Sequence, residues 1–407
     1  MIDHMLTIFS SFDDRARPKG SRDPLGAEAS WSFLGRKIVG NLTTVTSNLD
    51  NFMVALLCCH HASQGQADTE RIQERYLRAE QVAAYLKLSA GSLGTGFLGI
   101  TQARKNFSRD HIALGNAAEA QLLASQAGYG LWGLYSSALE AAGLIADASR
   151  RLSPSGDALV NDIISELGSA NWDEFCTLAS GKTLDKARTA RLAPQFVVTL
   201  GCAPLRAKVV QALLARQREC ALQAEVFPLA QAYLGQQQDW NIVDFCGWIL
   251  SNSNASGVLK TTMQRIRSLD SLLKLADIVM LWLQGKNGES IDELAQSLQP
   301  FVLALALGDE WQHEVELPHR AFLMELRAAA LEGDATAVIR AILTQNKSLM
   351  QARGGAAWIE SDGMRKLVVR VRNDKPQDLD SLGILDTDWR YTYFLSSFLS
   401  ITQQGQA

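Results

Sequence analysis

Two short segments combine the residue types that bind metal ions. Cys58-Cys59-His60-His61 offers two thiols and two imidazoles, but four consecutive residues of a helix point in four directions. Structural zinc sites instead use ligand pairs spaced two to four residues apart. His313 and His319 are six residues apart with Pro318 between them, whereas a zinc protease helix needs histidines at i and i+4. We therefore predict no metal site and no cofactor.

Arg104 and His111 are the second pair with chemical potential. The six residues between them give a spacing that resembles the Arg…His pair of helical ribonucleases of the HEPN class. Such a pair would serve general acid–base cleavage of RNA. The chain has no Gly-x-Ser-x-Gly elbow and no kinase motif set. We therefore favour a protein without catalytic activity and keep a ribonuclease that uses Arg104 and His111 as the alternative.

Basic residues that could contact phosphate groups gather near both ends of the chain. Six of them lie between Arg15 and Lys37, against two acidic residues. Local clusters of this kind can bind nucleic acid although the net charge of the chain is −4. Solvated faces, or charges that meet acids on a partner, explain the clusters equally well. The predicted residues for binding nucleic acid or a partner are Arg22, Arg36, Lys37, Arg365, Lys366, Arg370 and Arg372.

The elements that position these residues are mostly helices. Only 9 of the 407 residues are proline, and 47% are apolar, which suits a helical globular protein. One stretch differs: Leu367, Val369 and Val371 alternate with Val368, Arg370 and Arg372, directly after Asp362-Gly363, the pair preferred in type I′ turns. We predict an all-α, multi-helix fold with one short C-terminal β-hairpin near residues 357–372.

Turn residues suggest two domains. Ser153-Pro154-Ser155-Gly156 ends one helical pattern and begins the next. We predict an N-terminal helical domain, 1–152, that carries the basic entry segment. Residues 153–407 would form a C-terminal helical domain with the hairpin and a terminal aromatic helix, Asp388–Thr402. Further helices are predicted at Ala113–Ser125 and Leu131–Arg151.

The sequence favours a cytoplasmic location. The N-terminus lacks a basic segment followed by a sustained apolar run, so we expect no signal peptide. Apolar runs such as Phe52–Cys59 are far shorter than the roughly 20 residues of a membrane span. The six cysteines are scattered through apolar helical patterns, which is typical of reduced thiols rather than of a disulfide framework. We expect no membrane association.

Two stretches of the N-terminal part stand out as a pair: Arg22-Asp23-Pro24-Leu25-Gly26 through Gly40-Asn41-Leu42-Thr43-Thr44, and Tyr129–Ser136 (YGLWGLYS). Together they resemble uncharacterised helical subunits encoded in bacterial anti-phage defence operons. The resemblance covers about the first 150 residues and carries no catalytic motif. It implies a subunit that works beside an ATPase, a helicase or a nuclease, with DNA or RNA as a further partner.

Three functions follow from these observations. The leading hypothesis is a non-enzymatic scaffold or adaptor subunit of a multi-component bacterial complex that acts on nucleic acid in anti-phage defence. The alternatives are a HEPN-like ribonuclease and a helical regulator that binds a small ligand.

Overall fold

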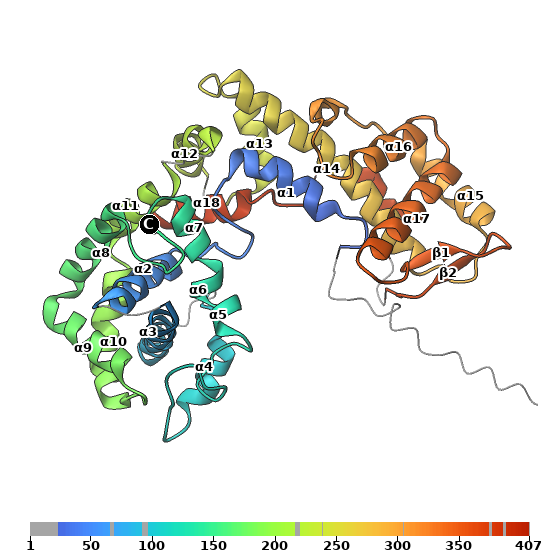
Figure 1. Ribbon diagram of the computed structural model, residues 1–407. Coiled ribbons are helices and arrows are strands. Elements are labelled where there is room, and N and C mark those ends of the chain that lie inside the picture. The colour runs from blue at the N-terminus through green and yellow to red at the C-terminus, as the bar shows by residue number, and fades with distance from the viewer. Residues whose placement is uncertain are drawn as a thin grey trace, which may run out of the picture. The chain divides into compact units, whose positions relative to one another are not determined.

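The computed structural model describes residues 23–65, 69–91, 97–215, 220–237, 239–303, 305–373, 377–385 and 388–406 (Figure 1). The chain forms two compact units. Unit 1 consists of Met1–Leu34 and Ser256–Thr392, and unit 2 consists of Gly35–Ala255 and Tyr393–Ala407. The boundary predicted after residue 152 lies within unit 2, so the units divide the chain differently. Each unit consists of two segments that are far apart in the sequence, so no single linker separates the units.

Helices are the main regular structure of the described residues, and one short hairpin is the only named sheet among them, as predicted. Helix α1 (Ala27–Ile38) contains the passage from unit 1 to unit 2. The other helices of unit 2 are α2 (Leu49–Ser63), α3 (Thr69–Ser89), α4 (Ile100–Phe107), α5 (Gln126–Tyr129), α6 (Leu131–Leu134), α7 (Ser136–Ala141), α8 (Pro154–Leu167), α9 (Ser169–Ser180), α10 (Lys186–Leu200), α11 (Ala203–Leu214), α12 (Ala221–Leu234), α13 (Ile242–Ser251) and α18 (Leu395–Gln404).

The core of unit 2 is organised around α2. Nearly every side chain of this helix is buried, so it is apolar all round rather than on one face. Asn48 precedes the helix and caps it, because its side chain accepts a hydrogen bond from the Asn51 N–H. Helix α3 packs beside it, and α8 and α11 also contact it (Figure 1).

Two predicted helices of unit 2 are wrong. Ala113–Ser125 is formed by turns, and its first residue pairs with Thr183 in an isolated bridge. The Gln81 side chain bonds both the N–H and the carbonyl of Gly115, which holds this segment in a non-helical path. Leu131–Arg151 is broken into α6 and α7 and then continues as a loop. Both helices were predicted from the spacing of apolar residues. That spacing carries no information about hydrogen bonds from distant side chains to the backbone.

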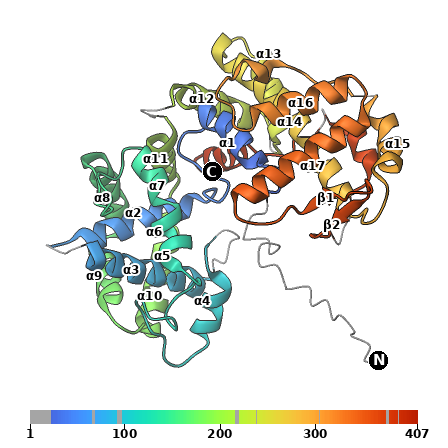
Figure 2. The same cartoon turned by 45° about the vertical axis from the view of Figure 1, so that its right-hand side comes forward.

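Unit 1 contains the long helix α14 (Gly257–Leu283), α15 (Ile291–Val302), η2 (Glu310–His313), α16 (Arg320–Leu331), α17 (Ala335–Ala352), β1 (Ile359–Ser361), β2 (Leu367–Val369) and η3 (Leu379–Ile384). Helix α17 packs against α15, α16 and β1. Figure 2 shows α17 beside the hairpin. This packing fixes the hairpin on the body of unit 1.

The hairpin is confirmed, but its turn differs from the prediction. The strands pair antiparallel in the register Ile359↔Val369 and Ser361↔Leu367, which leaves five residues, 362–366, in the connection. The Asp362 carboxylate accepts hydrogen bonds from the backbone N–H groups of Met364 (2.9 Å) and Lys366 (2.7 Å). The left-handed residue is Arg365, with φ of 59°, so Asp362-Gly363 does not form a two-residue type I′ turn.

The predicted terminal helix begins later than expected. Residues 388–394 are not helical, and α18 starts only at Leu395. Within unit 1, the buried Asp270 of α14 accepts hydrogen bonds from the backbone N–H groups of Arg390 (2.9 Å) and Tyr391 (3.2 Å). In a helix, these two N–H groups would donate to backbone carbonyls, but here they donate to the Asp270 carboxylate. The prediction of a helix over residues 388–394 is therefore wrong.

Gly26 is a position where only glycine fits. Its φ is +78°, and a Cβ atom built there would lie 2.4 Å from His319 Nε2. We expect Gly26→Ala to lower the free energy of unfolding by about 1–3 kcal/mol through backbone strain, and further through the clash. Gly65→Ala is the matched control, because Gly65 has φ of +81° and a Cβ atom placed on it would have no neighbour within 4 Å. Equal losses in denaturant unfolding of the two variants would show that the His319 contact adds nothing.

Candidate functional site

The first predicted cluster contributes little free charge. Arg22 lies outside the described residues. The half-buried Arg36 donates from Nη1 to the carbonyls of Val39 (3.3 Å), Gly40 (3.1 Å) and Leu42 (2.6 Å). Its guanidinium carbon lies 3.9 Å from the centroid of the Phe394 ring, and burial lowers its pKa. These contacts favour a role for Arg36 in holding the backbone after α1.

Lys37, next to Arg36 on α1, is also only partly exposed. A lysine or arginine that binds a phosphate backbone needs its charged group in solvent before binding. Helix α1 therefore presents less exposed positive charge to a nucleic acid than its basic residues suggested from sequence.

The second predicted cluster surrounds the hairpin and is exposed. Arg365 lies 2.8 Å from Asp292, but both side chains are more than half exposed, so this ion pair stabilises little. Arg370 pairs with Glu360 across the two strands. Lys366 and Arg372 are exposed, and none of the described hydrogen bonds or ion pairs involves their charged groups. The hairpin thus presents free positive charge.

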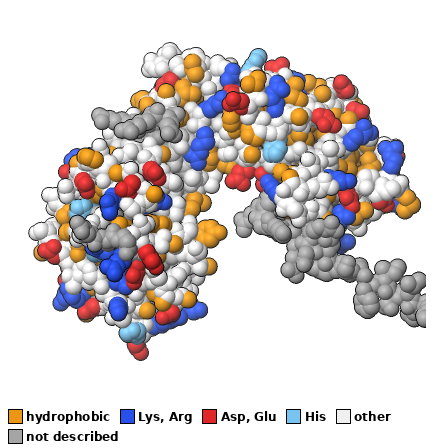
Figure 3. Space-filling view, in the orientation of Figure 1, with side chains coloured by type: hydrophobic (Ala, Val, Ile, Leu, Met, Phe, Trp, Pro, Cys, Tyr) orange, Lys and Arg blue, Asp and Glu red, His pale blue; other side chains and the backbone are white. Residues whose placement is uncertain are grey.

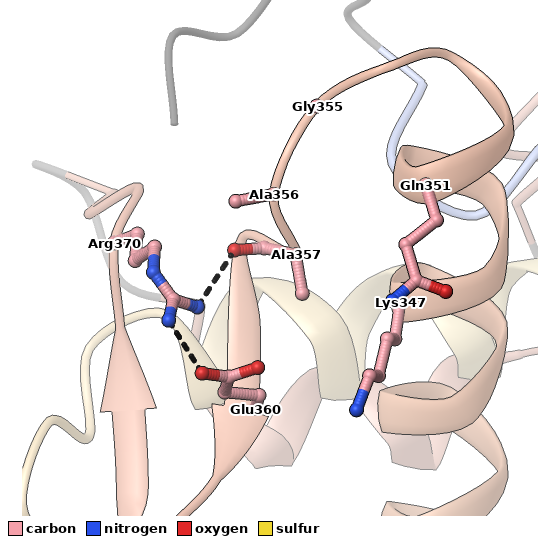
Figure 4. A pocket seen from close by; sticks show the side chains of 7 residues that line it. All are labelled: Lys347, Gln351, Gly355, Ala356, Ala357, Glu360 and Arg370. Carbon is pink, nitrogen blue, oxygen red and sulfur yellow. Dashed lines mark hydrogen bonds and ion pairs between the residues drawn. The ribbon is translucent and has the colours of Figure 1, made fainter. Parts of the chain in front are cut away.

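A small pocket lies between the hairpin and α17 (Figure 4). It has a volume of about 190 Å³. Its lining residues come from α17, from the loop after that helix, from β1 and from the residue that follows β2: Lys347, Gln351, Gly355, Ala356, Ala357, Glu360 and Arg370. Lys347 is on the helical wall, and the Arg370–Glu360 pair is on the strand wall.

The pocket offers more donors than acceptors. The Arg370 guanidinium donates to Glu360 and, at 3.3 Å, to the Ala357 carbonyl, and it has more N–H groups than these two contacts use. The Lys347 ammonium and the Gln351 amide take part in no hydrogen bond among the described residues. Two cations and one carboxylate leave a net charge of +1, so the pocket suits an anionic group.

Lys347 also belongs to a cationic face of α17. Arg340 precedes it by seven residues, which is two helical turns, so both side chains lie on the same face about 10 Å apart. Both are exposed. We define the α17–hairpin surface by Arg340, Lys347, Lys366, Arg370 and Arg372.

The predictions from sequence missed Arg340 and Lys347. Neither belongs to a run of basic residues, so a search for local charge clusters does not select them. A different signal was present: residues 335–359 contain no Asp or Glu, and residues 335–373 contain seven basic and two acidic residues. This segment therefore has a net charge of +5 in a chain of −4.

The charge of this segment is local. In the view of Figure 3, Lys and Arg side chains are interspersed with Asp and Glu over the visible face. Nucleic acid would therefore be attracted by particular surfaces and not by the field of the whole protein.

The residues of the ribonuclease alternative lie in and after α4. Arg104 and His111 are both exposed, and no hydrogen bond or ion pair among the described residues joins them. Catalytic pairs often tighten only when substrate is bound, so this geometry does not decide the alternative. It adds no support for it.

The cysteine–histidine segment of α2 is a part of the core. Burial raises the pKa of the Cys59 thiol to about 12, and burial together with the nearby Arg75 lowers the pKa of His61 to about 4. Both side chains are therefore neutral at pH 7. Within the described part of the chain, no group of three or more His, Cys, Asp or Glu side chains is arranged to hold a metal ion.

No family model, curated protein or solved structure matches this chain. Over the described residues, no single helix has the length and apolar composition needed to cross a bilayer, although the bent pair α10 and α11 reaches both when taken together.

Proposed function

We propose that the chain is a non-enzymatic scaffold subunit that holds nucleic acid through the α17–hairpin surface. The observation that carries this proposal is the net charge of +5 of residues 335–373, whose seven basic side chains are exposed and lie on or next to α17 and the hairpin. Lysine and arginine on such a surface bind phosphates and release counterions, which gives affinity without sequence preference.

The resemblance of the first 150 residues supplies the context. It supports a bacterial complex for anti-phage defence, in which an ATPase, a helicase or a nuclease performs the chemistry. In that setting the chain would keep DNA or RNA close to the catalytic subunit. A scaffold of this kind needs a binding surface and no reactive groups.

Charge reversal on the hairpin tests this function. Lys366→Glu combined with Arg372→Glu should weaken binding to short labelled DNA and RNA by at least about tenfold at low salt, because two phosphate contacts become repulsive. Fluorescence anisotropy at a fixed salt concentration measures the affinity.

The matched control is Lys260→Glu combined with Arg267→Glu. These residues lie on α14 in the same unit and give the same change in charge with the same residue types. The control should retain most of the affinity. If both double variants weaken binding equally, net charge and not this surface is responsible; if the wild type binds neither DNA nor RNA, the proposed function is wrong.

A further inference from the structure

The pocket beside the hairpin is a local depression, not an extended groove along the surface. It is bordered by α17 on one side, by Glu360 of β1 and Arg370 after β2 on the other, and by residues 355–357 between them (Figure 4). A continuous phosphodiester backbone follows an open surface, whereas a recess of about 190 Å³ receives a group that protrudes. On a nucleic acid, the protruding anionic group is the phosphate at the end of a strand.

We propose that this pocket binds a terminal phosphomonoester, so that the chain recognises strand ends. The proposal rests on the proposed function, since it names the part of the nucleic acid that this surface selects. A phosphomonoester carries a charge of about −1.5 to −2 at pH 7 and three acceptor oxygens. An internal phosphodiester carries less charge and exposes fewer free oxygens.

The pocket has hydrogen-bond donors on two of its walls. Lys347 and Gln351 lie one helical turn apart on α17, and Arg370 faces them from the strand side. Arg370 is held by its bonds to Glu360 and Ala357, so its orientation is fixed before a ligand arrives. Charge-assisted hydrogen bonds from such fixed donors are among the stronger ones.

Glu360 sets a second requirement. One of its oxygens accepts from Arg370, and none of the described hydrogen bonds involves the other. This carboxylate repels a bare anion, but it accepts a hydrogen bond from a hydroxyl or amino group. A nucleotide supplies both parts: the phosphate for Lys347 and Arg370, and a sugar hydroxyl or a base amino group for Glu360. The ligand class is therefore a phosphorylated nucleotide end rather than inorganic phosphate.

The test compares oligonucleotides of one sequence that carry a 5′ phosphate, a 3′ phosphate, or hydroxyls at both ends. We expect the wild-type protein to bind one phosphorylated form about tenfold more tightly than the hydroxyl form, and the two phosphorylated forms identify which end is read. A nucleoside monophosphate should compete for the preferred end, and inorganic phosphate at the same concentration should compete less.

Two lysine variants distinguish the contribution of the pocket from that of the rest of the α17–hairpin surface. Lys347→Gln should remove the preference for the phosphorylated end, whereas Lys366→Gln, outside the pocket, should weaken binding of all forms and keep the preference. Equal affinity of the wild type for all forms would overturn the pocket proposal and leave nucleic-acid binding intact. Failure to bind any form would overturn both.

Discussion

Replacement of Asp50 by Ala should lower the free energy of unfolding by about 3 kcal/mol, the lower end of the range for breaking a buried ion pair. Its Oδ2 lies 2.7 Å from Lys87 Nζ and its Oδ1 lies 2.7 Å from Arg206 Nη1. The side chains of Lys87 and Arg206 are only 5% and 13% exposed, so the variant leaves two buried cations without a carboxylate. Asp50 itself is 23% exposed, and this solvent contact places the loss at the lower end.

The same ion pairs give a dependence on pH. Burial alone would raise the pKa of Asp50, but the attraction of Lys87 and hydrogen bonds from Lys87 and Arg206 outweigh it and lower the pKa below its ordinary value. The folded protein therefore holds this proton less tightly than the unfolded chain. The stabilisation is present above the ordinary pKa of about 3.8 and is lost as the pH falls through the lowered value.

Asp162→Ala is the control for Asp50→Ala. Asp162 lies 2.8 Å from Lys208, but their side chains are 46% and 57% exposed. An exposed pair of this kind contributes roughly 0–1 kcal/mol. Denaturant unfolding of both variants at pH 7 makes the comparison, and similar losses would contradict the role assigned to burial.

The second large effect comes from Glu80 of α3, a carboxyl group buried in the core of unit 2. It accepts a hydrogen bond from the Leu131 N–H at 2.9 Å, and no described Lys or Arg forms an ion pair with it. Burial raises its pKa from 4.5 to about 7, although the Leu131 N–H and the Gln126 side chain act in the opposite direction. The folded protein thus binds this proton more tightly than the unfolded chain does.

Stability should therefore fall as the pH rises from 4.5 to about 7. Since one pKa unit corresponds to about 1.4 kcal/mol, the loss due to Glu80 is roughly 3 kcal/mol. Glu80→Gln keeps a carbonyl oxygen for the Leu131 N–H and removes the titration. We expect the variant to gain stability relative to the wild type over this pH range, up to that amount at pH 8.

The measurement is the difference in free energy of unfolding between Glu80→Gln and the wild type at pH 5, 6, 7 and 8. Titration of other groups cancels in this difference. Glu70→Gln, an exposed substitution on the same helix, should change stability by less than about 0.5 kcal/mol. A difference for Glu80→Gln that stays constant with pH would show that Glu80 does not titrate as described.

The fold class could be predicted because its signals are local. Scarce proline and apolar periodicity predicted helices, and the alternation at Leu367–Arg372 predicted the hairpin. Two of the helix errors lie where distant side chains act on the backbone: Gln81 holds Gly115, and Asp270 holds Arg390 and Tyr391. Such bonds join residues far apart in sequence and have no local pattern.

The candidate site also depends on contacts between residues that are far apart in the sequence. The hairpin cations, including Arg370, could be selected from sequence because they lie close together in it. Lys347 is brought to Arg370 only by the packing of α17 on β1. Arg36 shows the opposite case, because an apparently free cation is bonded to three carbonyls of its own chain.

The dependence of nucleic-acid affinity on salt tests the central claim most directly. For a labelled duplex, the logarithm of the association constant is measured against the logarithm of salt concentration, for the wild type and for Lys366→Glu combined with Arg372→Glu. Each lost phosphate contact should reduce the slope by about 0.9 on duplex DNA, so the double variant should lose roughly 2. An unchanged slope would contradict the claim that the α17–hairpin surface binds the phosphate backbone.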